Sequence, residues 1–168
     1  MRQVQVRADV AAVMAWLTDS SRREREWLPR VQAQQNVSEF SVTHLPSGGL
    51  RLEMLTRQGN LLIRQEIEDV AAHDGTIDRI LRGEATRGRA RTRWVVEQRI
   101  TAEFQGAATK VTVRALGRPV GRSLGWHLLG TNDTATARAL TTQAAQWTDF
   151  VVMEVAGHFG QDGADRNE

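Results

Sequence analysis

The feature that most constrains this chain is the alternation in the stretch RGRARTRWVVEQRI at 87–100, where arginine occupies every second position at its start. Successive side chains of a β-strand point to opposite faces of a sheet, so this period predicts a strand rather than a helix. Arg89, Arg91 and Arg93 then share one face. The opposite face carries the residues Thr92, Trp94, Val96, Gln98, Ile100, Ala102 and Phe104. We therefore expect a long strand with a solvated arginine face and an apolar face that builds the core.

An arginine-rich surface that binds nucleic acid is the competing interpretation of the same stretch. Such surfaces place exposed aromatic rings among the basic groups, whereas Trp94 points away from the arginines. Lys110 and Arg114 extend the basic face, and Glu97 and Glu103 are available for cross-strand pairing. The 22 basic and 20 acidic residues give a net charge of only +2, so the pI near 10.2 reflects arginine chemistry. We expect no nucleic-acid partner.

The period of two continues from 37 to 116 and is interrupted by the turn sequences PSGG, QGN, AHDG and QGA. Short alternating runs joined by such turns predict an antiparallel meander of six strands. A further short strand is expected at 4–6. The fold class is therefore predicted to be α+β once the helical segments are added.

Helical spacing appears at both ends of the chain. Asp9 is a good N-cap, and Val10, Val13, Met14 and Leu17 follow at i, i+3, i+4 and i+7. A second short helix is predicted at about 22–28, ending before Pro29 because proline disfavours helical conformation in the residue before it. A Gly-rich connection at 117–133 leads to a long helix at 134–159. Its apolar stripe consists of Leu140, Ala144, Trp147, Val151 and Val155.

The length of 168 residues suits a single domain, expected over 1–159 with a disordered polar tail at 160–168. No cysteine is present, which excludes disulfides and thiolate metal sites. The start lacks the apolar segment of a secretory signal, and no apolar run approaches the ~20 residues of a membrane span. We expect a soluble cytoplasmic protein without a membrane span, either a monomer or a homodimer.

Three segments, VQVRADVAAVMAWLTD, EWLPRV and WVVEQRITAEFQGAATKVTVRA, resemble the helix-grip fold of the START/Bet v 1-like (SRPBCC) superfamily. The resemblance is to its bacterial polyketide cyclase/dehydrase-type members and covers 1–159. In the last segment, Gly106 and the run Thr109–Thr112 look like the turn and the final strand of the family. The motifs are patterns of residue class, and the Gly-rich segment 117–133 is longer than a plain connection requires.

The resemblance implies a curved antiparallel sheet wrapped around a long C-terminal helix, with two short helices after the first strand and a cavity between the sheet and the long helix. It implies binding or transport of a hydrophobic small molecule, such as a lipid, polyketide or aromatic metabolite, without a cofactor. A polyketide cyclase or dehydratase that uses the same cavity is the alternative. A co-chaperone-like interaction module is the third hypothesis.

The expected ligand-binding residues are side chains on inward registers of the strands, one valine of the helix stripe and three of the five tryptophans. They are Trp27, His44, Met54, Ile63, Gln65, Trp94, Gln98, Trp147 and Val151. Apolar walls with a few polar groups are typical of small-molecule pockets. The plainer alternatives are that the tryptophans are ordinary core residues and that Gln65 and Gln98 lie near strand ends or bond to one another.

Catalytic residues stay unassigned, although His44, Gln65 and Gln98 are the first candidates for an enzyme. Glu154 and His158 share a helix face, as an acid–base pair or as a surface pair. The four histidines lack zinc spacing, so no metal site is expected. No GxSxG, P-loop or Rossmann motif occurs. Trp126, in LGWHLLG, is predicted to lie in a lid, in a partner-binding patch or in a short helix over the sheet edge.

Overall fold

The computed structural model describes residues 1–32, 37–57, 61–120 and 133–160. Within these ranges it does not describe the side chains at 27, 28, 30–32, 90, 133–137 and 139. The described elements follow in the order β1 (Arg2–Val6), α1 (Val10–Thr18), α2 (Ser20–Gln32), β2 (Val37–His44), β3 (Leu50–Thr56), β4 (Leu62–His73), β5 (Thr76–Arg87), β6 (Ala90–Gln105), β7 (Ala108–Pro119) and α4 (Asp133–Phe159). The fold is α+β, with one antiparallel sheet and a long C-terminal helix.

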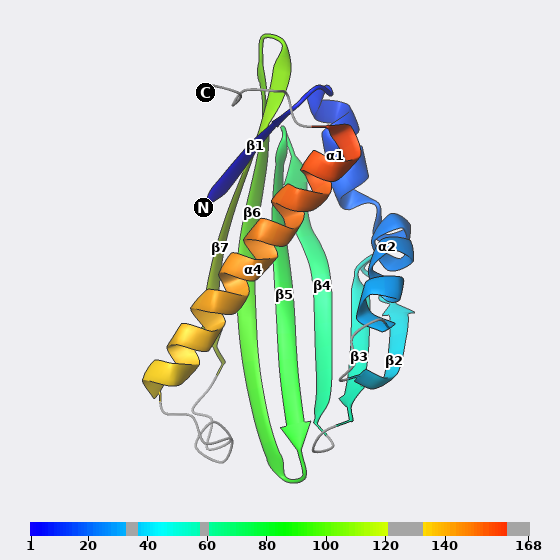
Figure 1. Cartoon of the computed structure of the whole chain (residues 1–168), viewed down its shortest axis with the longest axis vertical. Helices are drawn as coiled ribbons and strands as arrows, with labels where there is room; N and C mark the ends of the chain where they lie inside the picture. The colour runs from blue at the N-terminus through cyan, green and yellow to red at the C-terminus, as the bar shows by residue number, and fades with distance from the viewer. Residues whose placement is uncertain (33–36, 58–60, 121–132, 161–168) are drawn as a thin grey trace, which may run out of the picture.

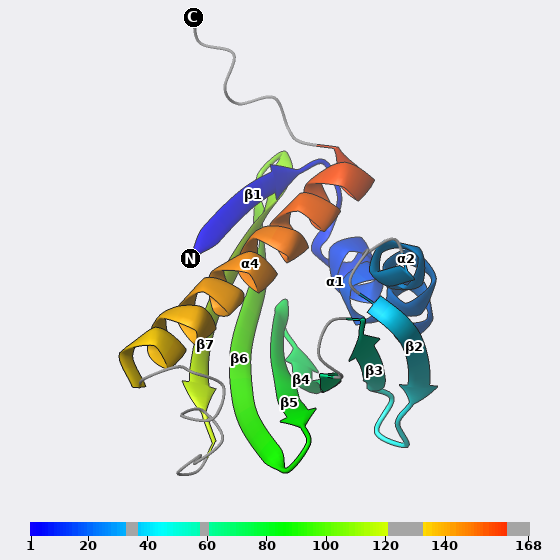
Figure 2. The ribbon, with the colours of Figure 1, turned by 60° about the horizontal axis from the view of Figure 1, so that its bottom comes forward.

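The sheet has seven strands in the order β1-β7-β6-β5-β4-β3-β2. Strands β2 to β7 form the six-stranded meander that the alternation predicts, and β1 adds to the free edge of β7. Figure 1 shows α4 running diagonally across the long strands, with α1 beside its C-terminal end and α2 next to β2 and β3. All three helices that the described residues form lie on one face, here called the inner face (Figure 2).

The first two helices begin at aspartates that cap them. The Asp9 carboxylate accepts a hydrogen bond of 2.6 Å from the Ala12 N–H at the start of α1. The Asp19 carboxylate accepts one of 3.0 Å from the Arg22 N–H, and this bond lowers the pKa of Asp19. The cap places Arg22 and Arg23 in the first turn of α2, where both side chains are buried.

The inner face carries two apolar clusters. The terminal cluster joins both ends of the chain and consists of Val4, Val6, Val13, Leu17, Ile77, Ile100, Ala102, Val111, Val113, Val151 and Val155. The meander cluster consists of Leu52, Ile67, Leu81, Ala85, Trp94, Val96, Leu140 and Ala144. The predicted stripe of α4 contributes to both, and only Trp147 of that stripe is half-buried.

Two expectations about single segments are wrong. The second helix does not stop before Pro29 but continues through it to Gln32. Phe104 is 63 % exposed, because it lies near the end of the β6–β7 hairpin beyond the reach of the helices.

Candidate ligand-binding site

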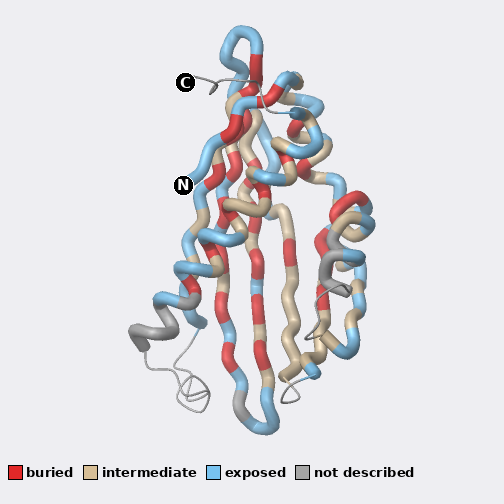
Figure 3. Tube along the Cα trace, in the orientation of Figure 1, coloured by how far each residue is buried: buried red, intermediate tan, exposed pale blue. Residues whose placement is uncertain are grey.

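Burial on the inner face changes from one side of the sheet to the other. The inward side chains of β5 and β6 are buried, for example Leu81 and Val96. On β2, β3 and β4 many inward side chains are only half-buried, among them Val42, Met54 and Ile63. The change is visible along the trace in Figure 3. Since α4 packs mainly on β7, β1 and β6, the inner face of the β2–β4 side retains apolar surface that no described helix covers fully.

A row of polar side chains separates the two apolar clusters. Asp69, Arg79 and Gln98 are Cα partners on β4, β5 and β6, and they form this polar row on the inner face. Along β5, the next side chains on the same face as Arg79 lie two positions away, a distance called one register step here. They are Ile77 of the terminal cluster on one side and Leu81 of the meander cluster on the other. A β-bulge follows Asp69, which is the usual device for re-aiming a strand side chain.

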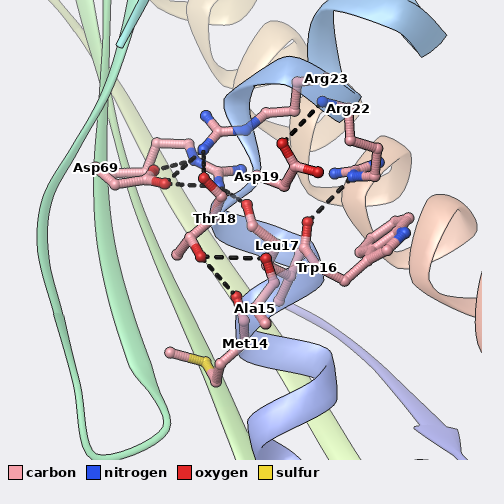
Figure 4. Close-up of polar contacts among 10 residues, drawn as sticks. Met14, Ala15, Trp16, Leu17, Thr18, Asp19, Arg22, Arg23 and Asp69 are labelled. Atoms are coloured by element: carbon pink, nitrogen blue, oxygen red, sulfur yellow. Dashed lines mark hydrogen bonds and ion pairs between the residues drawn. The ribbon is translucent and has the colours of Figure 1, made fainter. Parts of the chain in front are cut away.

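Arg23, Asp69 and Arg79 form what we call the buried triad. The Arg23 Nη2 donates to Asp69 Oδ2 at 2.6 Å, and the Arg79 Nε donates to Asp69 Oδ1 at 2.6 Å. Both arginines also reach the end of α1: Arg23 Nη2 donates to the Thr18 carbonyl and Arg79 Nη2 to the Leu17 carbonyl, at 3.2 and 2.9 Å. Figure 4 shows Arg23 and Asp69 pointing toward each other beside this helix end. Each guanidinium side chain is 3 % exposed.

The buried triad is incomplete in both charge and hydrogen bonding. Two cations share one carboxylate, and the Nε and Nη1 of Arg23 have no partner among the described residues. Burial, followed by the neighbouring Arg79, lowers the pKa of Arg23 to about 10, although Asp69 opposes the shift. A buried unpaired donor costs about 1–3 kcal/mol, so this arrangement destabilises the chain unless something else occupies the donors.

Gln98 completes the polar row with an unpaired acceptor. Its Nε2 donates to the Trp147 carbonyl of α4 at 3.4 Å, which fixes the orientation of the amide. The Oε1 atom is then buried without a hydrogen-bond partner in the described part of the chain. Gln98 does not pair with Gln65, which lies two register steps away on β4 and is half-buried.

The predicted site residues are only partly brought together. Ile63, Trp94 and Trp147 belong to or pack against the meander cluster, and Met54 and Gln65 lie on the same face. Val151 belongs instead to the terminal cluster. The side chain of Trp27 lies outside what the structure describes, as do Trp126 and most of 117–133.

His44 does not lie over an enclosed site. It is exposed at the end of β2, and its Nε2 lies 2.6 Å from the Glu24 carboxylate of α2. Along the sheet, β2 and β6 are separated by four strand spacings of ~4.8 Å, so His44 and Gln98 are not neighbours on the sheet. The structure does not assemble His44, Gln65 and Gln98 into one polar group.

His158 takes part in ring packing. Its ring stacks on Trp16 of α1 with centroids 4.9 Å apart, and the Arg22 guanidinium carbon lies 3.5 Å from the Trp16 ring centroid. This contact fastens the end of α4 to α1 and to the start of α2. His158 is exposed and Glu154 is half-buried on the same helix.

The opposite, outer face of the sheet carries the arginines of the alternating stretch, as predicted. Arg91 and Arg93 both pair with Glu84 of β5, and Glu97, expected to pair across strands, does so with Arg118 of β7. Two hollows of about 430 and 590 Å³ lie largely over this face, and a third of about 280 Å³ lies between α4, β7 and the start of β1. The arginine face is therefore a network of ion pairs.

Arg23, Asp69 and Arg79 are the members of the site that the sequence pattern did not single out. Arg79 stands in the run Ile77–Arg79–Leu81, and this inward register was the available signal. Asp69 follows Ile67 in the same way. No local signal marks Arg23, because the run SSRRERE has the composition of a solvated helix face.

Neither a metal centre nor a membrane-spanning helix is found in the described ranges. No group of three or more histidine, aspartate or glutamate side chains there is arranged to hold a metal ion. No helix among the same residues is long and apolar enough to cross a membrane.

Comparison with known proteins gives no family assignment. No family model matches the chain, and no curated protein matches it. Among solved structures, a conserved protein from Geobacillus kaustophilus is similar with 14 % identity and a TM-score of 0.48, covering 92 % of this chain and 93 % of that one. A hypothetical protein from Helicobacter pylori is similar with 15 % identity and a TM-score of 0.46, covering 92 % and 85 %.

Proposed function

We propose that this protein binds a hydrophobic small molecule on the inner face of the sheet, between the β2–β4 side and α4. The fold is proposed to be a helix grip, and the bound molecule to be a lipid, polyketide or aromatic metabolite. The observation that carries the proposal is the half-buried apolar surface that surrounds the meander cluster. Inward residues such as Val42 and Ile63 stay half-buried while their counterparts on β5 and β6 are fully buried.

The composition of this surface supports a ligand rather than a further packed helix. Its aromatic members, Phe40, Trp147 and Phe150, pack against the meander cluster from two different elements, β2 and α4. Trp147 and Phe150 meet edge to face with centroids 5.8 Å apart. Aromatic walls with few polar groups are usual in small-molecule sites, and the polar row supplies such groups at one end.

Carriage rather than catalysis is proposed because the candidate acid–base groups are not gathered on this surface. His44 is turned toward Glu24 at the rim, and the stacked His158 lies beside α1. General acid–base catalysis needs a titratable group within hydrogen-bond reach of the reacting atoms. The buried polar row contains two charged groups that already pair with each other and one amide.

The proposal is tested with two matched variants, Ile63→Gln and Ile80→Gln. Both isoleucines are half-buried strand residues, but Ile63 lies on the inner face and Ile80 on the outer face. The purified proteins are extracted with organic solvent, and the extracts are compared by mass spectrometry with that of an unrelated protein from the same host. We expect a stoichiometric hydrophobic compound with the wild type and with Ile80→Gln, and its loss with Ile63→Gln. Retention by Ile63→Gln, or an empty wild type that also ignores a panel of acyl and polycyclic probes, would overturn the proposal.

A further inference from the structure

The polar row and Arg23 together form a site with unused hydrogen-bonding capacity inside the protein. Arg23 keeps two nitrogens without a partner, and Gln98 keeps one oxygen without a partner, in the described part of the chain. All three atoms are out of contact with solvent. Buried polar groups in proteins are almost always paired, so unpaired ones in one region call for a partner that is not part of the chain.

The charge at this site is unbalanced in one direction. Two guanidinium groups and one carboxylate leave an excess of one positive charge, and the nearby Arg22 is already paired with Glu26 at 2.5 Å. The Arg23 side chain is 3 % exposed, so neither hydration nor a dissolved counter-ion compensates its charge. A bound ligand with a single negative charge would balance the site. Carboxylates are the natural partners of arginine.

We propose that Arg23, supported by Arg79, receives the carboxylate of a hydrophobic monocarboxylic acid whose apolar body lies on the meander cluster. This inference rests on the proposed function and adds the class of ligand. Gln98 Oε1 then accepts a hydrogen bond from a hydroxyl or amide group of the same molecule. Since the unpaired Arg23 nitrogens do not contact solvent, the acid reaches them from the apolar side, with an adjustment of the Arg23 side chain.

The position of the site agrees with such an amphipathic ligand. The polar row lies one register step from Leu81, Ile67 and Val96, which are members of the meander cluster. A molecule with its acid group at the polar row therefore has its apolar body over the half-buried surface. On the other side, the fully buried Ile77 and Ile100 of the terminal cluster close the site.

The test compares dodecanoic acid with dodecan-1-ol, two probes that share an apolar chain and differ in the acid group. Binding is measured by titration calorimetry for the wild type, for Arg23→Gln and for the control Arg89→Gln, which changes an exposed arginine in the β5–β6 turn. We expect the wild type and the control to bind the acid at least about tenfold more tightly than the alcohol, since a charge-assisted pair contributes that much. In Arg23→Gln the two affinities become similar.

Each outcome separates this inference from the proposed function. If both probes bind the wild type equally, or if Arg23→Gln keeps the preference for the acid, the carboxylate site is wrong while the apolar site stands. If neither probe binds, the carboxylate site is wrong, and the solvent extract of the wild type decides separately whether the proposed function stands.

A second measurement needs no variant and so does not depend on Arg23→Gln folding. The carboxyl carbon of [1-¹³C]dodecanoic acid bound to the wild type is followed by NMR as the pH is lowered. A carboxylate held by arginine stays ionised below the range of an ordinary carboxyl group, about 4. Titration of the bound acid in the ordinary range would refute the pairing.

Discussion

Replacing Gly83 by alanine tests how closely β5 and β6 are packed at the centre of the inner face. Gly83 and Trp94 are Cα partners, and the Trp94 indole lies over the glycine. A Cβ at position 83 would lie 2.0, 2.3 and 2.4 Å from three indole atoms. Ordinary carbon contacts are about 3.5–4.0 Å, so the ring or the strands must move by about 1.5 Å or more.

Two responses are open to the Gly83→Ala protein, and their costs can be compared. Turning the indole out exposes a side chain that is now 8 % exposed, which at about 200 Å² and 25 cal/mol per Å² costs up to about 5 kcal/mol. Shifting the strands while the ring stays is overpacking, which costs about 1–3 kcal/mol. The cheaper route dominates, so we expect a loss of about 3 kcal/mol and a Tm lowered by about 9 °C.

The assay combines urea unfolding with ¹⁹F NMR of 5-fluorotryptophan protein, in which five tryptophans give five signals. The Trp94 signal is assigned by its loss in Trp94→Phe, and we expect this signal to shift in Gly83→Ala. Gly157→Ala is the matched control, because a Cβ there meets nothing within 4 Å and alanine favours a helix interior. A Gly83→Ala protein as stable as the wild type, with the Trp94 signal unmoved, would refute the packing argument.

Three further predictions concern charge and ring packing. Asp69→Ala leaves two buried arginines without their carboxylate and is expected to lower the free energy of unfolding by about 4 kcal/mol, measured by urea denaturation; a loss below about 1 kcal/mol contradicts the buried triad. The pKa of Glu68 is lowered by its hydrogen bond with Ser47, and that of Glu84 by Arg91 and Arg93, which outweigh the opposing burial. Since these pKa values are lower in the folded than in the unfolded chain, where the ordinary value is 4.5, the stabilisation is present above that pH and is lost as the pH falls below it. Urea unfolding at pH 7 and at about pH 3.5 measures the loss, and equal stability at both would speak against it. Trp16→Ala removes the half-buried ring on which His158 stacks, and it is expected to lower the free energy of unfolding by about 2 kcal/mol. Hydrogen exchange of the backbone amides in the last turn of α4 is expected to become faster, and unchanged exchange there would show that the contact does not hold the helix end.

The alternation of side chains was sufficient to predict the meander and the face on which Trp94, Val96 and Ile100 lie. A strand has a period of two whatever its neighbours are, so this information is local. The same rule placed Phe104 inward, but burial also needs something to cover the position. The helices do not reach the end of that hairpin, and this depends on the whole fold.

The candidate site was harder to predict because its charged members become meaningful only as a group. Arg23 and Asp69 are 46 positions apart in the chain, and neither has a local pattern that marks it as buried. Arg79 stood in an inward register, but an arginine flanked on its own face by two apolar residues is equally typical of a solvated position at the edge of a sheet. His44 shows the opposite case, since its register was inward while the open side of the sheet left it exposed beside Glu24.

The pairing of β1 with β7 bears on the order in which this chain acquires its structure. Residues Arg2–Val6 leave the ribosome about a hundred residues before their partners Thr109–Val113. The hairpins of the meander can form locally in the meantime, while the terminal cluster must wait for Val111, Val113 and the end of α4. We therefore expect β1 and α1 to reach their final packing late, after β7 and α4 have been synthesised. Until β1 covers it, the edge of β7 is free to pair with strands of other chains.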